Sequence, residues 1–331
     1  MAIQPIDSAN RTLAVLAGHA AARIAGAGPT RLPGVYALVE VTPAAPAETG
    51  AAPAATPTPQ LTKAQVVATA VQSAVVRQDG LAPLIADLAQ ALKTGALPPP
   101  AREAAARVLA QATPLDVQAG GRDIARALGG SGLLLEAELA ANPAQSPVGV
   151  DLKAGLLLLR QALAGAQSDA PRRAARGPRP PPPYRGGPTA GQPPAEASLA
   201  EDTPPDVQRQ RLAEETESAL ARLELLQIAS LPQDEVDPIA RWMFETPVMT
   251  PQGPAVAQFE ISRDGRGRDA AGQEAPIWRA RFGLDTEPLG PVSAHLSLSG
   301  GQIGVMFWAQ RASAVELLRT QAPGLVRALT G

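Results

Sequence analysis

The tryptophans and phenylalanines, the side chains best suited to build a hydrophobic core, are confined to one end of this sequence. All three tryptophans and all four phenylalanines of the 331 residues lie between Trp242 and Trp308. Burial of a large apolar side chain contributes much more free energy than burial of alanine, which supplies much of the apolar content elsewhere. We therefore expect the best-packed domain at the C-terminal end and a more loosely packed region before it.

The overall composition argues against one large core and against several classes of function. The 35 prolines and 30 glycines make up about a fifth of the chain, which approaches the range of low-complexity sequence. The formal net charge of −2 gives no overall field that would attract nucleic acid or an anionic membrane. Without cysteine, and with only His19 and His295 as histidines, we expect no disulfide, no metal site and no cofactor.

The sequence predicts neither a membrane-spanning helix nor a signal peptide. The longest apolar stretch, residues 13–22, is interrupted by His19 and followed by Arg23, and it is shorter than the roughly 18 residues that a span requires. The first ten residues lack the basic charge of a secretory signal and contain Asp7. We interpret residues 13–22 as a small amphipathic helix and expect no membrane insertion.

The first half of the chain is expected to be mainly helical and only loosely packed. Residues 1–42 form an N-terminal segment with a short strand at 34–41, and residues 43–60 form a Pro/Ala-rich extended linker. Between residues 61 and 165, apolar side chains recur at steps of three and four, with glycines between the repeats. The helices expected there cover residues 67–92 with a break at Gly80, 102–111, 123–128, 133–141 and 151–163, the last capped by Asp151.

Two segments connect this region to the C-terminal domain. Residues 166–204 are rich in arginine, proline and glycine, with Tyr184 as the one aromatic side chain, so we expect a solvated, disordered linker. Residues 205–236 contain a connecting helix at 206–229, with Leu212, Leu223 and Leu226 on one face. Pro232 is expected to end this helix.

The C-terminal domain, residues 237–331, is predicted to be an antiparallel β-meander covered by helices, an α+β fold. Apolar and polar residues alternate along residues 255–262, 277–284, 292–298 and 303–309, and Gly300-Gly301 marks a turn. Residues 313–316 read Ser-Ala-Val-Glu, the pattern of a helix capping box. The leucine-rich helix that follows has an apolar stripe interrupted at Pro323, and it is expected to cover the apolar face of the meander.

These C-terminal residues resemble the flagellar hook-length control family. The resemblance rests on the segment Leu-Asp-Thr-Glu-Pro-Leu-Gly-Pro-Val at 284–292, the strand Val-Met-Phe-Trp-Ala at 305–309 and the leucine-rich helix to Leu329. It covers roughly residues 277–331 and extends weakly back to 240–242. In this chain Glu287 precedes Pro288, whereas the family form has its prolines before the glutamate. The chain also ends at Gly331, where the family usually continues into a short strand, so an open sheet edge or a shortened protein is expected.

The resemblance implies an exported, monomeric and non-enzymatic length ruler of the flagellar type III apparatus. Its N-terminal part would contact hook and hook-cap subunits. Its C-terminal domain would bind the cytoplasmic domain of the export switch protein and change secretion from hook to filament subunits. The partner-binding residues expected at the corner between two strands and beside it are Glu287, Pro288, Leu289, Gly290, Val292 and Trp308.

Three alternatives remain open at this level. A needle-length regulator of a virulence-type secretion system would have the same physical properties. An enzyme would have to use the loop carboxylates Asp264, Asp269, Asp285 and Glu287 as an acid–base pair, although no catalytic motif surrounds them. A nucleic-acid binder would have to use the arginine-rich linker, which lacks a stacking platform. His295 is expected on the outward face of its strand.

Overall fold

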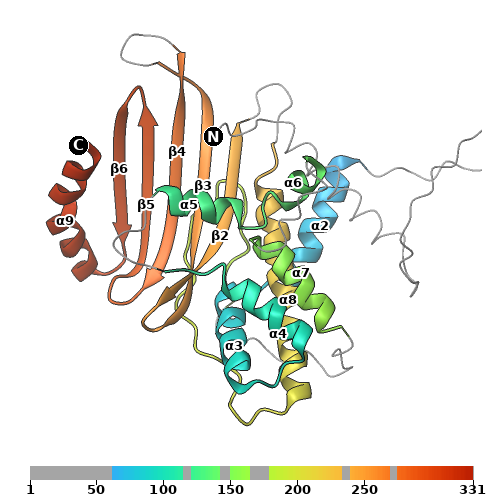
Figure 1. Cartoon of the computed structure of the whole chain (residues 1–331). Helices are drawn as coiled ribbons and strands as arrows, with labels where there is room; N and C mark the ends of the chain where they lie inside the picture. The colour runs from blue at the N-terminus through green and yellow to red at the C-terminus, as the bar shows by residue number, and fades with distance from the viewer. Residues whose placement is uncertain are drawn as a thin grey trace, which may run out of the picture.

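The computed structural model describes six parts of the chain, and the expectations for residues 1–61 lie outside them. The described residues are 62–114, 121–141, 150–164, 179–232, 239–268 and 274–330. Within them, most of the helices lie on one side of a six-stranded sheet, and the last helix lies at the opposite edge of that sheet (Figure 1). This arrangement confirms the predicted α+β class.

The helices of the first half begin and end close to where the apolar periodicity predicts. Asp151 caps α7 as expected, because its carboxylate accepts a hydrogen bond of 2.8 Å from the Ala154 N–H. Thr62 and Gln65 form a capping box at the start of α2. The helices are α2 (Lys63–Arg77), α3 (Leu81–Thr94), α4 (Pro99–Leu109), α5 (Gly121–Gly129), α6 (Leu135–Ala141), α7 (Leu152–Ala162) and α8 (Pro205–Ala229).

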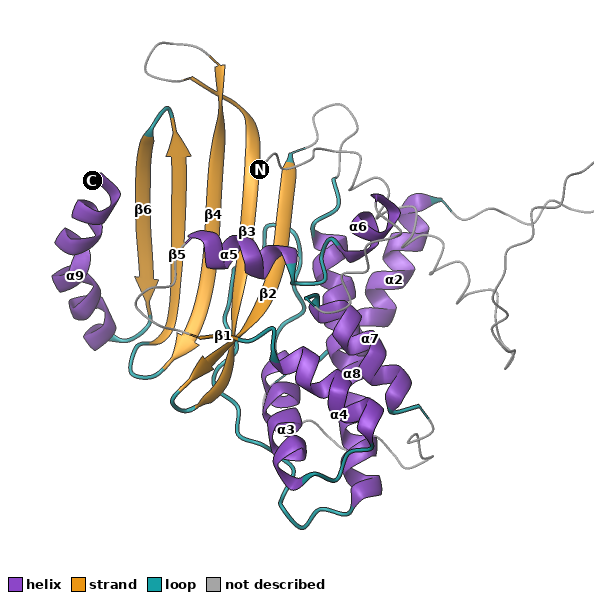
Figure 2. Ribbon diagram, in the orientation of Figure 1, coloured by secondary structure: helices purple, strands orange, loops and turns teal. Residues whose placement is uncertain are grey.

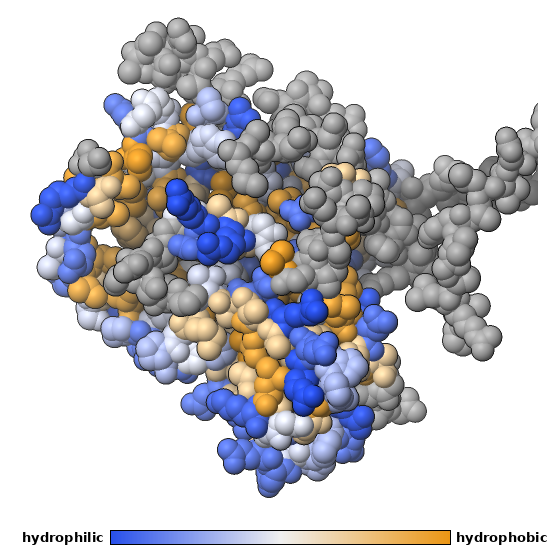
Figure 3. Space-filling view, viewed as in Figure 1, coloured by the Kyte–Doolittle hydropathy of each residue, from blue (hydrophilic) through white to orange (hydrophobic). Residues whose placement is uncertain are grey.

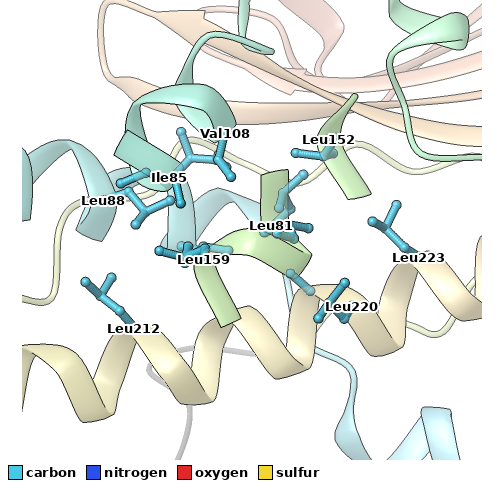
Figure 4. Close-up of a cluster of buried hydrophobic side chains, with 14 of the residues drawn as sticks. Leu81, Ile85, Leu88, Val108, Leu152, Leu159, Leu212, Leu220 and Leu223 are labelled. Atoms are coloured by element: carbon cyan, nitrogen blue, oxygen red, sulfur yellow. The ribbon is translucent and has the colours of Figure 1, made fainter. Parts of the chain in front are cut away.

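These helices share a closely packed core, which differs from the loose packing expected. Side chains from α3, α4, α7 and α8 point toward one another in Figure 4. Ile85, Val108, Leu159 and Leu212 are fully buried in this cluster. Leucine and alanine are therefore sufficient for close helix packing here, because small alanines let the helices approach one another.

Helix α8 lies at the centre of the helical part and is buried on more than one face. Its Leu212 and Leu223 pack with α3, α4 and α7, whereas its Ala221 and Leu225 pack against Ala74 of α2. The prediction of one apolar face for α8 was therefore incomplete, because α2 covers a second face of this helix.

The sheet has the strand order β1-β2-β3-β4-β5-β6 (Figure 2). Strands β3 to β6 form the predicted antiparallel meander, β2 adds a strand that was not predicted, and Gly300-Gly301 makes the two-residue turn between β5 and β6. The short β1 comes from the helical half of the chain and pairs in parallel with β2. The strands are β1 (Thr113–Pro114), β2 (Ala240–Thr250), β3 (Gly253–Arg268), β4 (Glu274–Thr286), β5 (Gly290–Ser299) and β6 (Gln302–Ala309).

One face of the sheet, which we call the apolar face, carries a row of aromatic rings in contact with one another. The ring centroids of Phe244 and Phe259 are 5.1 Å apart, and those of Phe259 and Phe282 are 5.8 Å apart. Trp242 and Trp278 stack at 6.3 Å on the same face. Such cross-strand aromatic pairs fix the register of β2, β3 and β4.

The opposite face of the sheet packs against the helices, so helices and sheet share one core. Met243 of β2 and Val256 of β3 belong to the same buried cluster as the leucines of α3 and α8. The predicted boundaries suggested that the sheet forms a domain separate from the helical half. The shared core shows that the two pack together.

Residues 179–204, which we call the strap, cross this opposite face instead of forming a solvated linker. Gln192 bridges to Val256 through two backbone hydrogen bonds of 2.9 and 3.1 Å, and its side-chain oxygen accepts the N–H groups of Leu81 and Ala82 at the start of α3. The strap passes so close to Gly283 of β4 that a Cβ atom there would lie 2.5 Å from the Thr189 carbonyl oxygen. Polar side chains and backbone hydrogen bonds thus hold much of the strap, and Leu199 joins it to the buried core. Hydrophobic periodicity cannot reveal the polar contacts.

Helix α9 (Ala312–Thr330) does not cover the apolar face, contrary to expectation. It lies beside β6 at the edge of the sheet and contacts that strand (Figure 1). It begins at Ala312, so the capping box predicted at Ser313 does not form, and Glu316 bonds Arg319 instead. The helix is continuous through Pro323.

No helix among the described ranges combines the length and apolar character that a bilayer span requires.

Candidate partner-binding surface

The turn between β4 and β5 forms a corner that Arg311 holds in place. Its guanidinium donates two hydrogen bonds to the carboxylate of Glu287, at 2.5 and 2.7 Å, and a third to the Pro288 carbonyl oxygen at 3.1 Å. These bonds lower the pKa of Glu287 and raise the pKa of Arg311. Both side chains are exposed, so the pair positions the corner more than it stabilises the fold.

Gly290 is required at this corner for two reasons. Its φ of +69° lies in the left-handed region, which residues with a side chain rarely adopt and glycine adopts readily. A Cβ atom at this position would also lie 2.5 Å from the Arg311 Nε. The glycine therefore lets Arg311 pass directly over the turn to reach Glu287.

Arg311 explains why α9 lies at the sheet edge. It precedes the helix, and its carbonyl oxygen accepts the first helical hydrogen bond, from the Val315 N–H at 3.1 Å. The neighbouring Gln310 N–H donates to the Pro291 carbonyl oxygen at 3.3 Å. These contacts hold the start of α9 beside the corner and direct the helix along β6. Sequence reasoning missed Arg311, because its partner Glu287 is 24 residues away and nothing in the spacing links them.

The six predicted residues do not form one surface. Glu287, Pro288, Leu289 and Gly290 lie together in the corner. Val292 pairs with Ala309 on the apolar face, whereas Trp308 pairs with Ser293 and lies on the opposite face. The structure thus groups the corner residues and separates Val292 from Trp308.

Trp308 packs against His295, with ring centroids 4.2 Å apart. His295 lies on the face away from the apolar one, as predicted. Burial against the tryptophan lowers the pKa of His295, and the positive charge of Arg281 lowers it further. Trp308 itself remains 45% exposed, so much of its ring is open to a partner.

Large apolar side chains are exposed at this edge of the sheet, on both of its faces, and most of them were not predicted as site residues. Strand β6 exposes apolar side chains on both faces, with Met306 on one and Phe307 on the other. Hydrophobic side chains gather over the strands between α9 and α5 in Figure 3. The exposed large apolar residues of β5, β6 and α9 are Leu298, Ile303, Met306, Phe307, Trp308, Leu317, Val326 and Leu329. The alternating pattern predicted that the apolar side of each strand is buried. For this reason the exposed apolar side chains of β5 and β6 were not expected.

Of the four carboxylates considered for an enzyme, the structure describes the side chains of Asp285 and Glu287. The side chains of Asp264 and Asp269 lie outside the described residues. Glu287 is bound by Arg311, and burial raises the pKa of the nearby Asp285. A cavity of about 540 Å³ lies between α5, β2 and the end of α4, and none of the six predicted residues lines it.

Comparison with known proteins concerns this same part of the chain. Residues 266–331 match the model of the family described as flagellar hook-length control protein FliK. This family is regulatory and non-enzymatic. No curated protein and no solved structure matches the chain. The matched segment contains β4, β5, β6, α9 and all six predicted residues. The C-terminal segment of this chain is therefore similar to the flagellar hook-length control family, which confirms the resemblance expected from its sequence.

Proposed function

We propose that this protein controls the length of the flagellar hook as a monomeric export substrate of the type III apparatus. In this proposal its N-terminal part contacts hook and hook-cap subunits during export. Its C-terminal segment then binds the cytoplasmic domain of the export switch protein and changes secretion from hook to filament subunits.

The exposed apolar surface of β5, β6 and α9 supports the binding step. All of its members lie within the segment that matches the hook-length control family. Exposed apolar side chains that gather in one region of a soluble protein are typical of a surface for another protein. Trp308 is a suitable anchor, since half-exposed tryptophans are enriched among the residues that dominate binding energy. The corner held by Arg311 borders this surface and gives it a fixed edge.

Isothermal titration calorimetry of the full chain with the cytoplasmic domain of the switch protein tests the proposal. We expect saturable binding that Trp308→Ala weakens about tenfold or more. Val76→Ala is the matched control, because Val76 is an exposed apolar residue of α2 on the helical side. Absence of binding, or equal effects of the two substitutions, would refute this role of the surface.

A further inference from the structure

A cluster of three arginines lies on the sheet face opposite the apolar one, beside Trp308. Arg241 of β2 and Arg281 of β4 each bond one oxygen of Glu260, which stands between them on β3. Glu260 is only 3% exposed, and both of its oxygens are used by these bonds. We call Arg185, Arg241 and Arg281, together with Glu260, the arginine cluster.

Arg185 reaches the same place from the strap and adds positive charge. Burial lowers the pKa of Arg185, the charge of Arg241 lowers it further, and Glu260 raises it. These effects place the Arg185 guanidinium within electrostatic range of both groups. Three guanidinium groups therefore lie near one carboxylate, and two of them, those of Arg241 and Arg281, bond it directly.

The cluster has hydrogen-bond donors that the protein leaves unused. An arginine carries five N–H donors, and the buried Nε of Arg241 has no hydrogen-bond partner among the described residues. A buried donor without a partner is costly, and an anion that accepts from it removes that cost. The side chains of Arg241 and Arg281 remain 19% and 23% exposed, so an anion can reach them from solvent.

Apolar and aromatic side chains continue from the cluster toward the sheet edge. His295 pairs with Arg281 across β4 and β5 and contacts Trp308, and Met306 stands opposite His295 on β6. Met306 is 58% exposed. Arginine, tryptophan and methionine are the residue types that protein interfaces favour at their centres.

We propose that the arginine cluster binds an acidic segment of a protein partner, with carboxylate groups on the arginines and apolar side chains on Met306 and Trp308. Carboxylates match the fork of a guanidinium group and form two parallel hydrogen bonds with it. The inference goes beyond the hook-length proposal, because it specifies a ligand chemistry that does not depend on which protein supplies it.

The surroundings favour a peptide over a nucleic acid. Strong nucleic-acid binding uses many phosphate contacts along an extended basic surface. Here a carboxylate, that of Glu260, stands between Arg241 and Arg281 and neutralises part of their charge. The neighbouring surface is apolar, which suits the side chains of a peptide better than a phosphate backbone.

Fluorescence anisotropy with the full chain and a fluorescein-labelled oligo-glutamate peptide tests the proposal. We expect saturable binding at low salt that weakens as salt is added. Arg281→Gln should weaken binding about tenfold, the loss of one charged hydrogen-bonded contact. Glu260→Gln should tighten binding, because it removes the carboxylate that competes for the arginines.

Arg319→Gln is the matched control, since Arg319 is exposed on α9 and pairs with Glu316. Arg185→Gln is a second test. It removes one positive charge of the cluster, and none of the described hydrogen bonds to Glu260 involves Arg185. Tryptophan fluorescence verifies that each variant is folded. Lack of saturable binding by the folded parent chain would overturn the proposal. So would equal losses in Arg281→Gln and Arg319→Gln, or tighter binding of single-stranded DNA than of the peptide.

Discussion

Arg222 and Glu245 form a buried ion pair that joins the central helix α8 to the first long strand, β2. The Nη2–Oε1 distance is 2.7 Å and the Nε–Oε2 distance is 2.8 Å. Gln192 of the strap and Gln258 of β3 each donate a further hydrogen bond of 3.1 Å to the same carboxylate. Helices, strap and sheet therefore meet at one fully bonded carboxylate, which is 1% exposed.

Removal of one partner should destabilise the whole fold. Arg222→Met leaves the carboxylate of Glu245 buried without its counter-charge, and we expect a loss of about 3–5 kcal/mol in the free energy of unfolding. Urea denaturation measures this loss. Arg77→Met is the control, because the ion pair of Arg77 with Glu224 likewise links α8 to another element, here α2, but is partly exposed. This substitution should cost about 1 kcal/mol or less. Similar losses in the two variants would contradict the role given to Glu245.

The shared core predicts that helices and sheet unfold together. All three tryptophans lie in the sheet, so their fluorescence reports on the sheet, whereas far-ultraviolet circular dichroism is dominated by the helices. We expect the two urea transitions to coincide. Leu156→Ala, in the helical core, should shift both transitions by about 2–5 kcal/mol. Leu317→Ala, at an exposed site on α9, should shift neither. Separate transitions would show that the two halves fold independently.

Gly290→Ala tests the packing of the corner. Alanine at a positive φ costs about 1–2 kcal/mol, and its Cβ would in addition displace Arg311. Gly301→Ala is a matched control, because Gly301 also has a positive φ, of +80°, but has no atom within 4 Å of an added Cβ. Thermal unfolding should show a larger loss for Gly290→Ala than for Gly301→Ala. Equal losses would mean that Arg311 does not constrain the turn.

Asp151 should make stability depend on pH. Burial raises the pKa of this carboxyl to about 6, and its Oδ2 has no hydrogen-bond partner among the described residues. The folded state thus holds the proton more tightly than the unfolded state. The resulting stabilisation is complete below the unfolded pKa of about 4 and is lost as pH rises through about 6.

Asp151→Asn keeps the helix cap and removes this titration. Relative to the parent chain, it should gain up to about 3 kcal/mol between about pH 4 and about pH 7. Urea denaturation at the two pH values gives the difference. Glu215, whose pKa burial also raises, titrates in both proteins and cancels from the comparison. A constant difference between the variants would contradict the raised pKa.

Apolar periodicity predicted the fold wherever one face of an element is buried. It located α3, α7 and strands β3 to β6, and it placed Asp151 at a helix cap. It missed β2, because Met243 packs against the helices while Phe244 packs on the apolar face, so apolar residues do not alternate there. It also missed the strap, which buried polar side chains such as Gln192 hold in place.

The candidate surface was predictable only in part. Turn-forming residues and the family resemblance located the corner at Glu287 to Gly290. Val292 and Trp308 lie on different faces because of the register of β5 and β6. The alternation of apolar and polar residues in the sequence could have predicted this register. The bond from Arg311 to Glu287 and the arginine cluster join residues distant in sequence, and hydrophobic periodicity gives no information on such polar contacts.

Hook length in a strain that lacks this gene tests the functional account most directly. Electron microscopy of isolated hooks should show overlong hooks without filaments, and the intact gene should restore normal length. Hooks of normal length that carry filaments in the deletion strain would contradict hook-length control as the function of this protein.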